Sequence, residues 1–176
     1  MDLGNNYSEQ HAPSVQFIRD FITKGSLDDI SWTSDPTPWD GDPDQVHNCF
    51  GFAVGSKKFW QPPSIHGDPE GDPRFYWPPE LLGDADENTW VSRYVAAAQA
   101  KGFSECGEDA SLEVEFEKIV LIHSGGVFKH AALQIDEKRW KSKLGLLSDL
   151  EHPLEFMLRN PFGKGTIYMK RKRALR

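Results

Sequence analysis

The sequence has few cysteines, no long apolar run and no excess of positive charge. Its 176 residues include two cysteines, Cys49 and Cys106, which excludes a framework of several disulfides but not a single bridge. No apolar run approaches the roughly 20 residues of a membrane-spanning helix. The first residues form neither the basic region nor the apolar core of a secretory signal peptide. We therefore expect a cytoplasmic protein without membrane association, with signal-independent export as the alternative.

The formal net charge of −7 argues against nucleic acid as the main partner. The basic segment 170–173 is an exception, and we expect it to end a surface strand rather than to bind phosphates. The length predicts a single domain over residues 1–176, with a loose N-terminal segment at 1–12. The composition does not determine an oligomeric state.

The order of the expected elements is helices first and an antiparallel meander afterwards. Helical spacing of apolar residues predicts helices over 14–23 and 89–101, the second ended by Gly102. A further helix is expected over 151–158. The expected strands are 103–106, 117–123, 127–136, 140–144 and 165–172. This order predicts an α+β fold.

Two proline-rich connections interrupt these elements. Residues 31–46 are rich in aspartate, but their spacing is not that of an EF-hand, so we expect a solvated loop. Residues 56–86 carry many aromatic side chains, and such a long irregular connection is unusual in a compact domain. Trp60, Tyr76 and Trp77 are therefore candidates for the wall of a substrate groove. The alternative is that this segment covers one edge of the core.

The stretch around Cys49 predicts a short, closely packed helix. Asn48 is a favourable N-cap, which places Cys49 at the first helical position, and Gly55 is suited to end the helix. The unpaired N–H groups of a helix start favour a thiolate, so we expect the pKa of Cys49 to be lowered. Gly51 is small enough for the helix to approach a sheet closely. The alternative is a buried cysteine that serves only packing.

His130 is the best candidate for a base that would activate the Cys49 thiol. It lies in the predicted strand 127–136, and the small Ala131 and Ala132 leave room for another element to approach. A Cys49 helix packed on this strand would bring thiol and imidazole together. The alternative is a structural histidine, and His47, His123 and His152 compete for the role. Cys49 and His47 have no second ligand pair at a zinc spacing, so we expect no metal and no cofactor.

The stretch 48–52 (Asn-Cys-Phe-Gly-Phe) resembles the Asp-Cys-Ser-Gly-Phe motif of NlpC/P60 cysteine peptidases, members of the papain-like superfamily. The triplet at His130 resembles their second motif, His-Val-Gly. The resemblance implies a papain-like fold with N-terminal helices packed on an antiparallel sheet, a nucleophile at Cys49 and a base at His130. Over residues 46–172 the chain also resembles an uncharacterised group of bacterial domains. These domains share a segment like residues 140–145 of this chain (Trp-Lys-Ser-Lys-Leu-Gly), followed by a histidine such as His152. That group has no established activity to transfer.

The resemblance places the third catalytic group about a dozen residues after the histidine, at Ser142 with Lys143 beside it. Neither is the usual residue type. The orienting group is therefore left open among these two and three further candidates, Gln134, Asp136 and His152. The candidates for stabilising an oxyanion are Gln45, Asn48 and the backbone N–H of Cys49.

Two functions follow from this sequence. The first is a cysteine-dependent hydrolase or acyltransferase of peptidase, amidase or deamidase type, acting on a protein, a peptide or a small amide or acyl substrate. The second is a catalytically inactive papain-like domain that binds partners through the aromatic segment 59–79. An orienting group beside His130 would favour the enzyme, whereas a Cys49 thiol buried away from any histidine would favour the binding domain.

Overall fold

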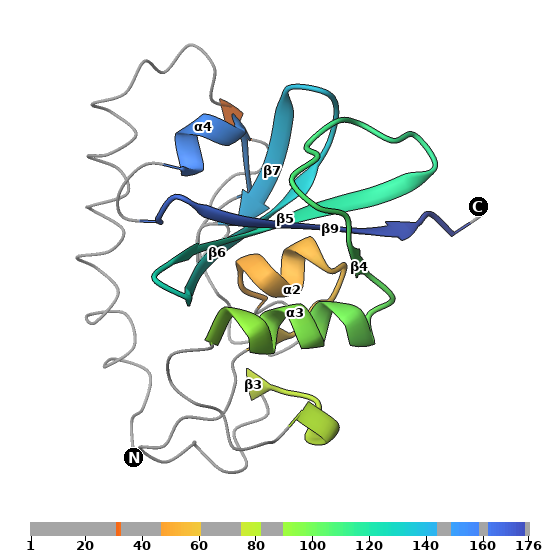
Figure 1. The fold of residues 1–176 in the computed structure, drawn as a ribbon, viewed down its shortest axis with the longest axis vertical. Helices are drawn as coiled ribbons and strands as arrows, with labels where there is room; N and C mark the ends of the chain where they lie inside the picture. Colours follow the sequence, from red (N-terminus) through yellow and green to blue (C-terminus); the bar gives the residue numbers. More distant parts are fainter. Residues whose placement is uncertain are drawn as a thin grey trace.

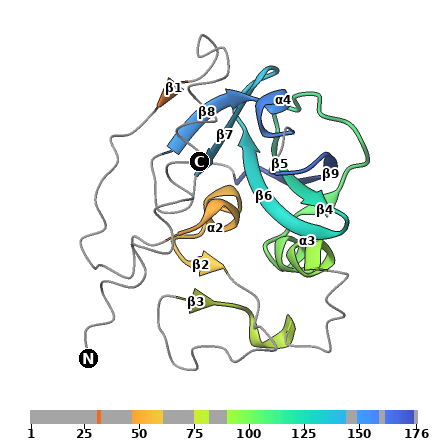
Figure 2. The same cartoon turned by 90° about the vertical axis from the view of Figure 1, so that its left-hand side faces the viewer.

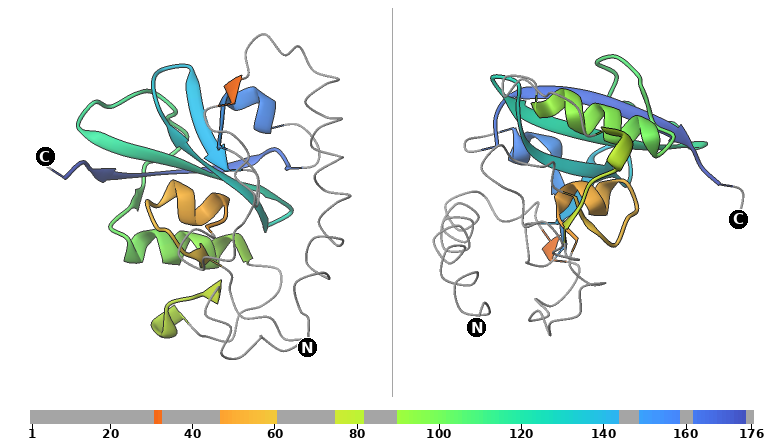
Figure 3. Two further views of the ribbon diagram at one scale, coloured as in Figure 1. Left: turned by 180° about the vertical axis from the view of Figure 1, so that it is seen from behind. Right: turned by 90° about the horizontal axis from the view of Figure 1, so that it is seen from below.

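The computed structural model describes residues 31–32, 47–60, 75–81, 90–143, 149–158 and 162–174. Seven antiparallel strands form one sheet in the order β1-β8-β7-β6-β5-β9-β4. Helices α2 and α3 lie on one side of β5 and β9, and α4 lies on the other side (Figure 1). The view from behind shows the same separation (Figure 3). The predicted α+β class is thus confirmed.

The elements have the following bounds. The sheet strands are β1 (Ser31–Trp32), β4 (Ser104–Glu105), β5 (Phe116–Ser124), β6 (Val127–Gln134), β7 (Arg139–Lys143), β8 (Asp149–Pro153) and β9 (Gly165–Lys172). The helices are α2 (Cys49–Ala53), the 3-10 turn η3 (Pro79–Leu81), α3 (Trp90–Ala100) and α4 (Leu154–Met157). A small parallel pair, β2 (Phe59–Trp60) and β3 (Phe75–Tyr76), lies on the far side of α2 from the sheet (Figure 2).

Both faces of the central sheet are buried, which explains the continuous apolar run in β5. Ile119 and Leu121 pack with α2 and α3, on what we call the α2 face. Val120 and Ile122 pack on the opposite side with α4, on what we call the α4 face. Strand β5 pairs with β6 on one edge and with the whole of β9 on the other.

The predicted helix over 151–158 is wrong in its first half. Residues 149–153 form β8, which pairs with β7 in a register that places Trp140 opposite His152. Leu150 and His152 are both fully buried, so this segment has the period of two that a strand requires. Helix α4 begins only after Pro153 and is a single short turn. The predicted helix over 14–23 lies outside the described residues.

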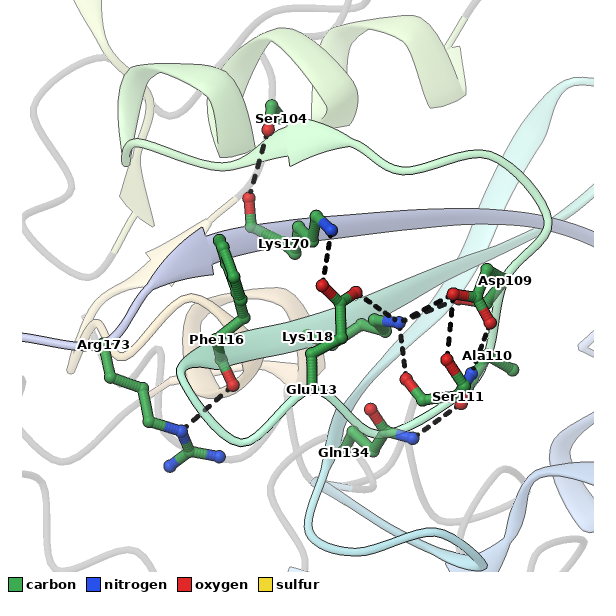
Figure 4. A network of polar contacts seen from close by, with 10 residues as sticks. All are labelled: Ser104, Asp109, Ala110, Ser111, Glu113, Phe116, Lys118, Gln134, Lys170 and Arg173. Carbon is green, nitrogen blue, oxygen red and sulfur yellow. Dashed lines mark hydrogen bonds and ion pairs between the residues drawn. The ribbon is translucent and has the colours of Figure 1, made fainter.

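The loop between β4 and β5 is held over the α4 face by buried polar side chains (Figure 4). The Lys118 ammonium is 1% exposed and donates to the carbonyl oxygens of Asp109 at 3.0 Å and of Ser111 at 2.5 Å. It also forms an ion pair with Glu113 at 3.1 Å. Because a buried charge needs such partners, these contacts fix the path of the loop. None of the described helices is long and apolar enough to cross a membrane.

Candidate active site

Helix α2 begins at Cys49 and is capped as the sequence predicts. The Asn48 side-chain oxygen accepts the Gly51 N–H at 3.0 Å and the Trp60 N–H at 3.3 Å, and its amide donates to the Trp60 carbonyl at 2.6 Å. Gly55 follows the helix with a φ of 73°. Asn48 therefore fastens β2 to the helix start through both its oxygen and its amide.

The close approach at Gly51 is made to the chain after the helix rather than to the sheet. A Cβ at this position would overlap the Lys58 carbonyl oxygen and would lie 3.1 Å from the Trp60 ring. The expectation of a small residue was correct, but the neighbour it accommodates is the segment leading into β2. The helix itself packs on β6 and β7.

The Cys49 thiol is protonated, contrary to the expectation of a lowered pKa. Burial raises its pKa to about 11, although the backbone N–H groups of Ala131, Phe50 and Cys49 each oppose the increase. The residue as a whole keeps partial exposure. A five-residue helix supplies too little stabilisation to offset the loss of water around a thiolate. Both Cys49 and Cys106 are free thiols.

His130 lies on the strand that α2 packs against, but its ring is on the α4 face. It pairs with Ile122, and its ring is 4.9 Å from that of Phe162. Burial and, second, the nearby His152 lower the pKa of His130 to about 3, so the imidazole is neutral. Its Nε2 atom is buried and has no hydrogen-bond partner among the described residues. Within the described residues, no hydrogen bond joins Cys49 to His130.

A bulge in β6 explains this orientation. Phe128 pairs with His123 and His130 pairs with the preceding Ile122, so Lys129 is an extra residue between them. Phe128 packs on the α2 face, and regular alternation from Phe128 would place His130 on that same face. The extra residue instead places Ala131 on the α2 face. The Cys49 thiol consequently meets the backbone N–H of Ala131, immediately after His130.

Ser142 and His152 form a buried pair on the α4 face. Ser142 Oγ lies 2.9 Å from His152 Nε2, and His152 Nδ1 lies 2.9 Å from the Pro153 carbonyl oxygen. Since a carbonyl only accepts, Nδ1 donates to it and Nε2 accepts the serine hydroxyl. Burial lowers the pKa of His152 to about 4. The structure therefore brings Ser142, His152 and His130 to one face, but neither Ser142 nor His152 bonds the His130 ring.

The remaining candidates for the third group have other partners. Asp136 accepts the backbone N–H groups of Lys138 at 2.9 Å and of Arg139 at 2.8 Å, and thereby closes the turn before β7. Gln134 lies on the His130 face, but its amide donates to the Ala110 carbonyl at 2.7 Å (Figure 4). Burial lowers the pKa of Lys143, and the negative charge of Asp149 partly opposes this decrease. Gln45 lies outside the described residues.

The aromatic groove candidates pack together under α2. Trp60 has no exposed surface, so it lies in the core and does not line a groove in this structure. The rings of Tyr76 and Trp77 lie 4.7 and 6.2 Å from that of Trp60, and both residues keep partial exposure. This arrangement matches the alternative interpretation, in which the segment covers an edge of the core.

Tyr94 on α3 is a neighbour of Cys49 that the sequence did not reveal. Burial and, second, the nearby Cys49 thiol hold the pKa of Tyr94 well above its usual range, so its hydroxyl stays protonated. The sequence placed Tyr94 on the apolar face of a helix. A hydroxyl group on that face was the signal that could have marked it as a candidate. Among the described residues, no cluster of three His, Cys, Asp or Glu side chains could hold a metal ion.

The comparisons with known proteins give a family but no activity. A family model described as "Domain of unknown function (DUF7689)" matches residues 39–170. No curated protein matches the chain, and no solved structure matches it. The match extends from before α2 to within β9, so it includes Cys49, His130, Ser142 and His152.

Proposed function

This chain belongs to the DUF7689 family, and we propose that it is a papain-like, cysteine-dependent hydrolase or acyltransferase with Cys49 as nucleophile and His130 as base. One observation carries the proposal. The backbone N–H groups of Ala131, Phe50 and Cys49 each lower the pKa of the Cys49 thiol, and Ala131 is the residue after His130. Donors in this position favour negative charge on the sulfur when it loses its proton.

The reaction begins with both groups uncharged. The neutral His130 ring takes the thiol proton as the Cys49 sulfur attacks the carbonyl carbon of an amide, ester or thioester. The new C–S bond sends the carbonyl electron pair to oxygen, and collapse of this intermediate expels the amine, alcohol or thiol with the proton from His130. Attack by water or another acceptor on the resulting thioester then releases the acyl group and restores Cys49.

Among the described residues, the Nε2 atom of His130 has no hydrogen-bond partner, so it can accept a proton. Burial lowers the pKa of this ring to about 3, however, so His130 is a weak base until that burial is relieved. The proposal requires the imidazole and the thiol to come within hydrogen-bonding distance when substrate binds. Because the His130 ring lies on the α4 face and helix α2 packs on the other face, the ring must change face to reach the thiol. This is a larger change than the shortening of a long hydrogen bond that many unliganded enzymes require. The bulge at Lys129 lies directly before His130, which makes the local backbone the natural place for this adjustment.

A non-catalytic binding domain is the second candidate, and the state of the thiol favours it. Cys49 is protonated, and in the described part of the chain it has no hydrogen bond to a histidine. The aromatic segment 59–79, which was expected to bind the partner, offers less exposed surface than expected, because Trp60 is fully buried. Among the residues of that segment whose exposure the structure describes, Tyr76 and Trp77 keep partial exposure.

The test uses p-nitrophenyl acetate, an activated ester that acylates a competent thiol. Intact-mass spectrometry counts acetyl groups on the folded wild type and on the Cys49→Ala and Cys106→Ala variants, while absorbance follows the release of p-nitrophenol. We expect a single acetyl group on the wild type and on Cys106→Ala, and none on Cys49→Ala. Acetylation that persists in Cys49→Ala would instead support the binding domain. So would a folded wild type that is not acetylated and releases p-nitrophenol no faster than Cys49→Ala.

A further inference from the structure

We propose that the loop between β4 and β5, residues 106–115, is a charge-controlled cover of the α4 face. It is closed while the Glu113 carboxylate is ionised, and it opens when that carboxylate accepts a proton. Below we call these residues the acidic loop, because they include Glu108, Asp109, Glu113 and Glu115. The inference goes beyond the proposed function and does not depend on the chemistry of Cys49.

One carboxylate of the acidic loop joins two lysines of the sheet. Glu113 Oε2 accepts from Lys170 Nζ at 2.6 Å, and Glu113 Oε1 lies 3.1 Å from Lys118 Nζ (Figure 4). The two lysines are directly opposite each other in the pairing of β5 with β9. Glu113 therefore neutralises two neighbouring ammonium groups. Asp109 also faces Lys118, but at 3.9 Å and with 58% of its side chain exposed, so it contributes less.

The acidic loop itself is what keeps Lys118 from water. The ammonium is 1% exposed, and it donates to the carbonyl oxygens of Asp109 and Ser111. A buried charge that loses its counter-ion is strongly destabilising. Since the partners of Lys118 belong to the loop, movement of the loop would replace them with water. The closed loop thus requires a charged Glu113, whereas the open loop does not.

Apolar packing contributes a small share of what holds the acidic loop. Cys106 and Ala110 pack against the apolar cluster of the α4 face, but Val114 is 80% exposed. The Ala110 carbonyl oxygen accepts the Gln134 amide at 2.7 Å, which is a further polar contact. Segments with few buried apolar contacts open locally at a lower free energy than the whole domain requires. The loop can therefore respond to one charge while the sheet stays folded.

The direction of the pH effect follows from the groups around Glu113. Hydrogen bonds from Lys170 and, second, from Lys118 lower its pKa from the ordinary 4.5. An open loop would return this pKa to its ordinary value. The contribution of Glu113 to closure is therefore complete above about pH 4.5, and it is lost as the pH falls through the lowered pKa.

Two other titratable groups of the loop face the same lysines. The pKa of Asp109 is also lowered, first by its hydrogen bonds with Ser111, so protonation of Asp109 acts in the same direction as protonation of Glu113. Burial raises the pKa of Cys106, so its thiol is uncharged near pH 7 and does not replace the carboxylate.

The test uses Glu113→Gln, which imitates the protonated carboxylate at pH 7. Hydrogen exchange followed by mass spectrometry reports on the loop, in which the Ser111 N–H donates to Asp109 Oδ1 at 2.8 Å and the Phe116 N–H donates to the Glu113 carbonyl at 2.9 Å. Because hydrogen bonds to charged groups are among the stronger ones, we expect these amides to exchange about tenfold faster or more. Exchange in β5 should stay unchanged. Glu115→Gln, at an exposed position of the same loop, is the matched control and should behave like wild type.

Acid provides a second arm of the test. Between pH 7 and pH 4, after correction for the intrinsic effect of pH on exchange, loop exchange relative to β5 exchange should rise in wild type. It should rise less in Glu113→Gln, because that variant has already lost the charge.

Three results would overturn the inference, provided that circular dichroism shows folded variants. The first is unchanged loop exchange in Glu113→Gln. The second is an equal increase in Glu115→Gln, which would mean that the loop responds to any lost charge. The third is an increase shared equally by the loop and β5, which would mean that the whole domain is destabilised.

Discussion

The two faces of the sheet are built on different principles. The α2 face is held by apolar packing, with Phe50, Trp60 and Tyr94 in edge-to-face contacts around helix α2. The α4 face carries the buried polar side chains of the described residues, namely Lys118, His130, Gln134, Ser142 and His152. The proposed nucleophile lies with the first group, and the proposed base lies with the second.

This difference separates what stabilises the protein from what responds to conditions. Aromatic packing changes little with pH, whereas each buried polar group depends on its partner and its protonation state. The α4 face should therefore be sensitive to acid and to loss of single hydrogen bonds. The α2 face should be sensitive to changes of volume. The stability predictions below test this contrast.

Acid should produce the largest effect, and it should act on the α4 face. The folded pKa values of His130 and His152 are about 3 and about 4, below their ordinary value of 6.5. Below about pH 6.5 the unfolded chain therefore binds protons that the folded chain does not. Stability is complete above that pH and falls by up to about 1.4 kcal/mol per pH unit for each histidine.

Urea unfolding midpoints between pH 7 and pH 4 measure this loss. His130→Leu should reduce the dependence on pH, and the double substitution of His130 and His152 should reduce it further. The pKa values of the carboxylates Asp109, Glu113 and Asp136 are lowered in the folded protein. Their stabilising contribution is therefore lost only at a lower pH than that of the histidines. A dependence between pH 7 and pH 5 that is identical in all three proteins would refute the account of the α4 face.

Trp60→Ala tests the α2 face by creating a cavity. Removal of a fully buried aromatic side chain typically costs about 3–5 kcal/mol. Trp77→Ala is the matched control, because Trp77 is partly exposed and its removal should reduce stability less. Thermal unfolding of both variants at pH 7 gives the comparison. A smaller loss of stability in Trp60→Ala than in Trp77→Ala would contradict the buried position of Trp60 and would support its role in the wall of a groove.

Gly51→Leu tests the same face by overpacking. A side chain at this position meets the Lys58 carbonyl and the Trp60 ring, and overpacking typically costs about 1–3 kcal/mol. Lys57→Leu changes an exposed residue of the same segment and should be nearly neutral. An unchanged melting temperature for Gly51→Leu would show that α2 does not contact the segment leading into β2.

Ser142→Ala removes a single hydrogen bond from the α4 face, and it sharpens the contrast between the two faces. It leaves His152 Nε2 buried without its 2.9 Å donor, which typically costs about 1–3 kcal/mol. In His152→Phe the same serine substitution should cost less, because the hydrogen bond is already absent. Additive losses in this double-mutant cycle would mean that the two side chains do not interact.

Local signals predicted much of the fold. The N-cap at Asn48, the helix start at Cys49 and the four main strands of the sheet follow from residue type and spacing, and the structure contains them. The strand at 149–153 was missed because its apolar residues continue into α4 and imitate one helix. Its pairing with β7 is a non-local contact that the local pattern does not encode.

The candidate site was harder to predict, because it depends on which face each side chain occupies. A single bulged residue, Lys129, changes the face of His130, and the sequence of β6 contains no glycine or proline that signals a bulge. The pKa of Cys49 was predicted in the wrong direction because the helix start was visible and the burial was not. The same limit concealed the contact of Tyr94 with Phe50, the residue after Cys49.

The pairing of Cys49 with His130 is the central claim, and the pH dependence of acylation tests it most directly. The rate of p-nitrophenol release on modification of Cys49 is measured from pH 6 to pH 11 in wild type and His130→Ala. Since a general base typically contributes a factor of about 100 or more, wild type should react that much faster near pH 7. The difference should disappear near pH 11, where the Cys49 thiol ionises without help. Two superimposed curves from folded proteins would contradict the pairing.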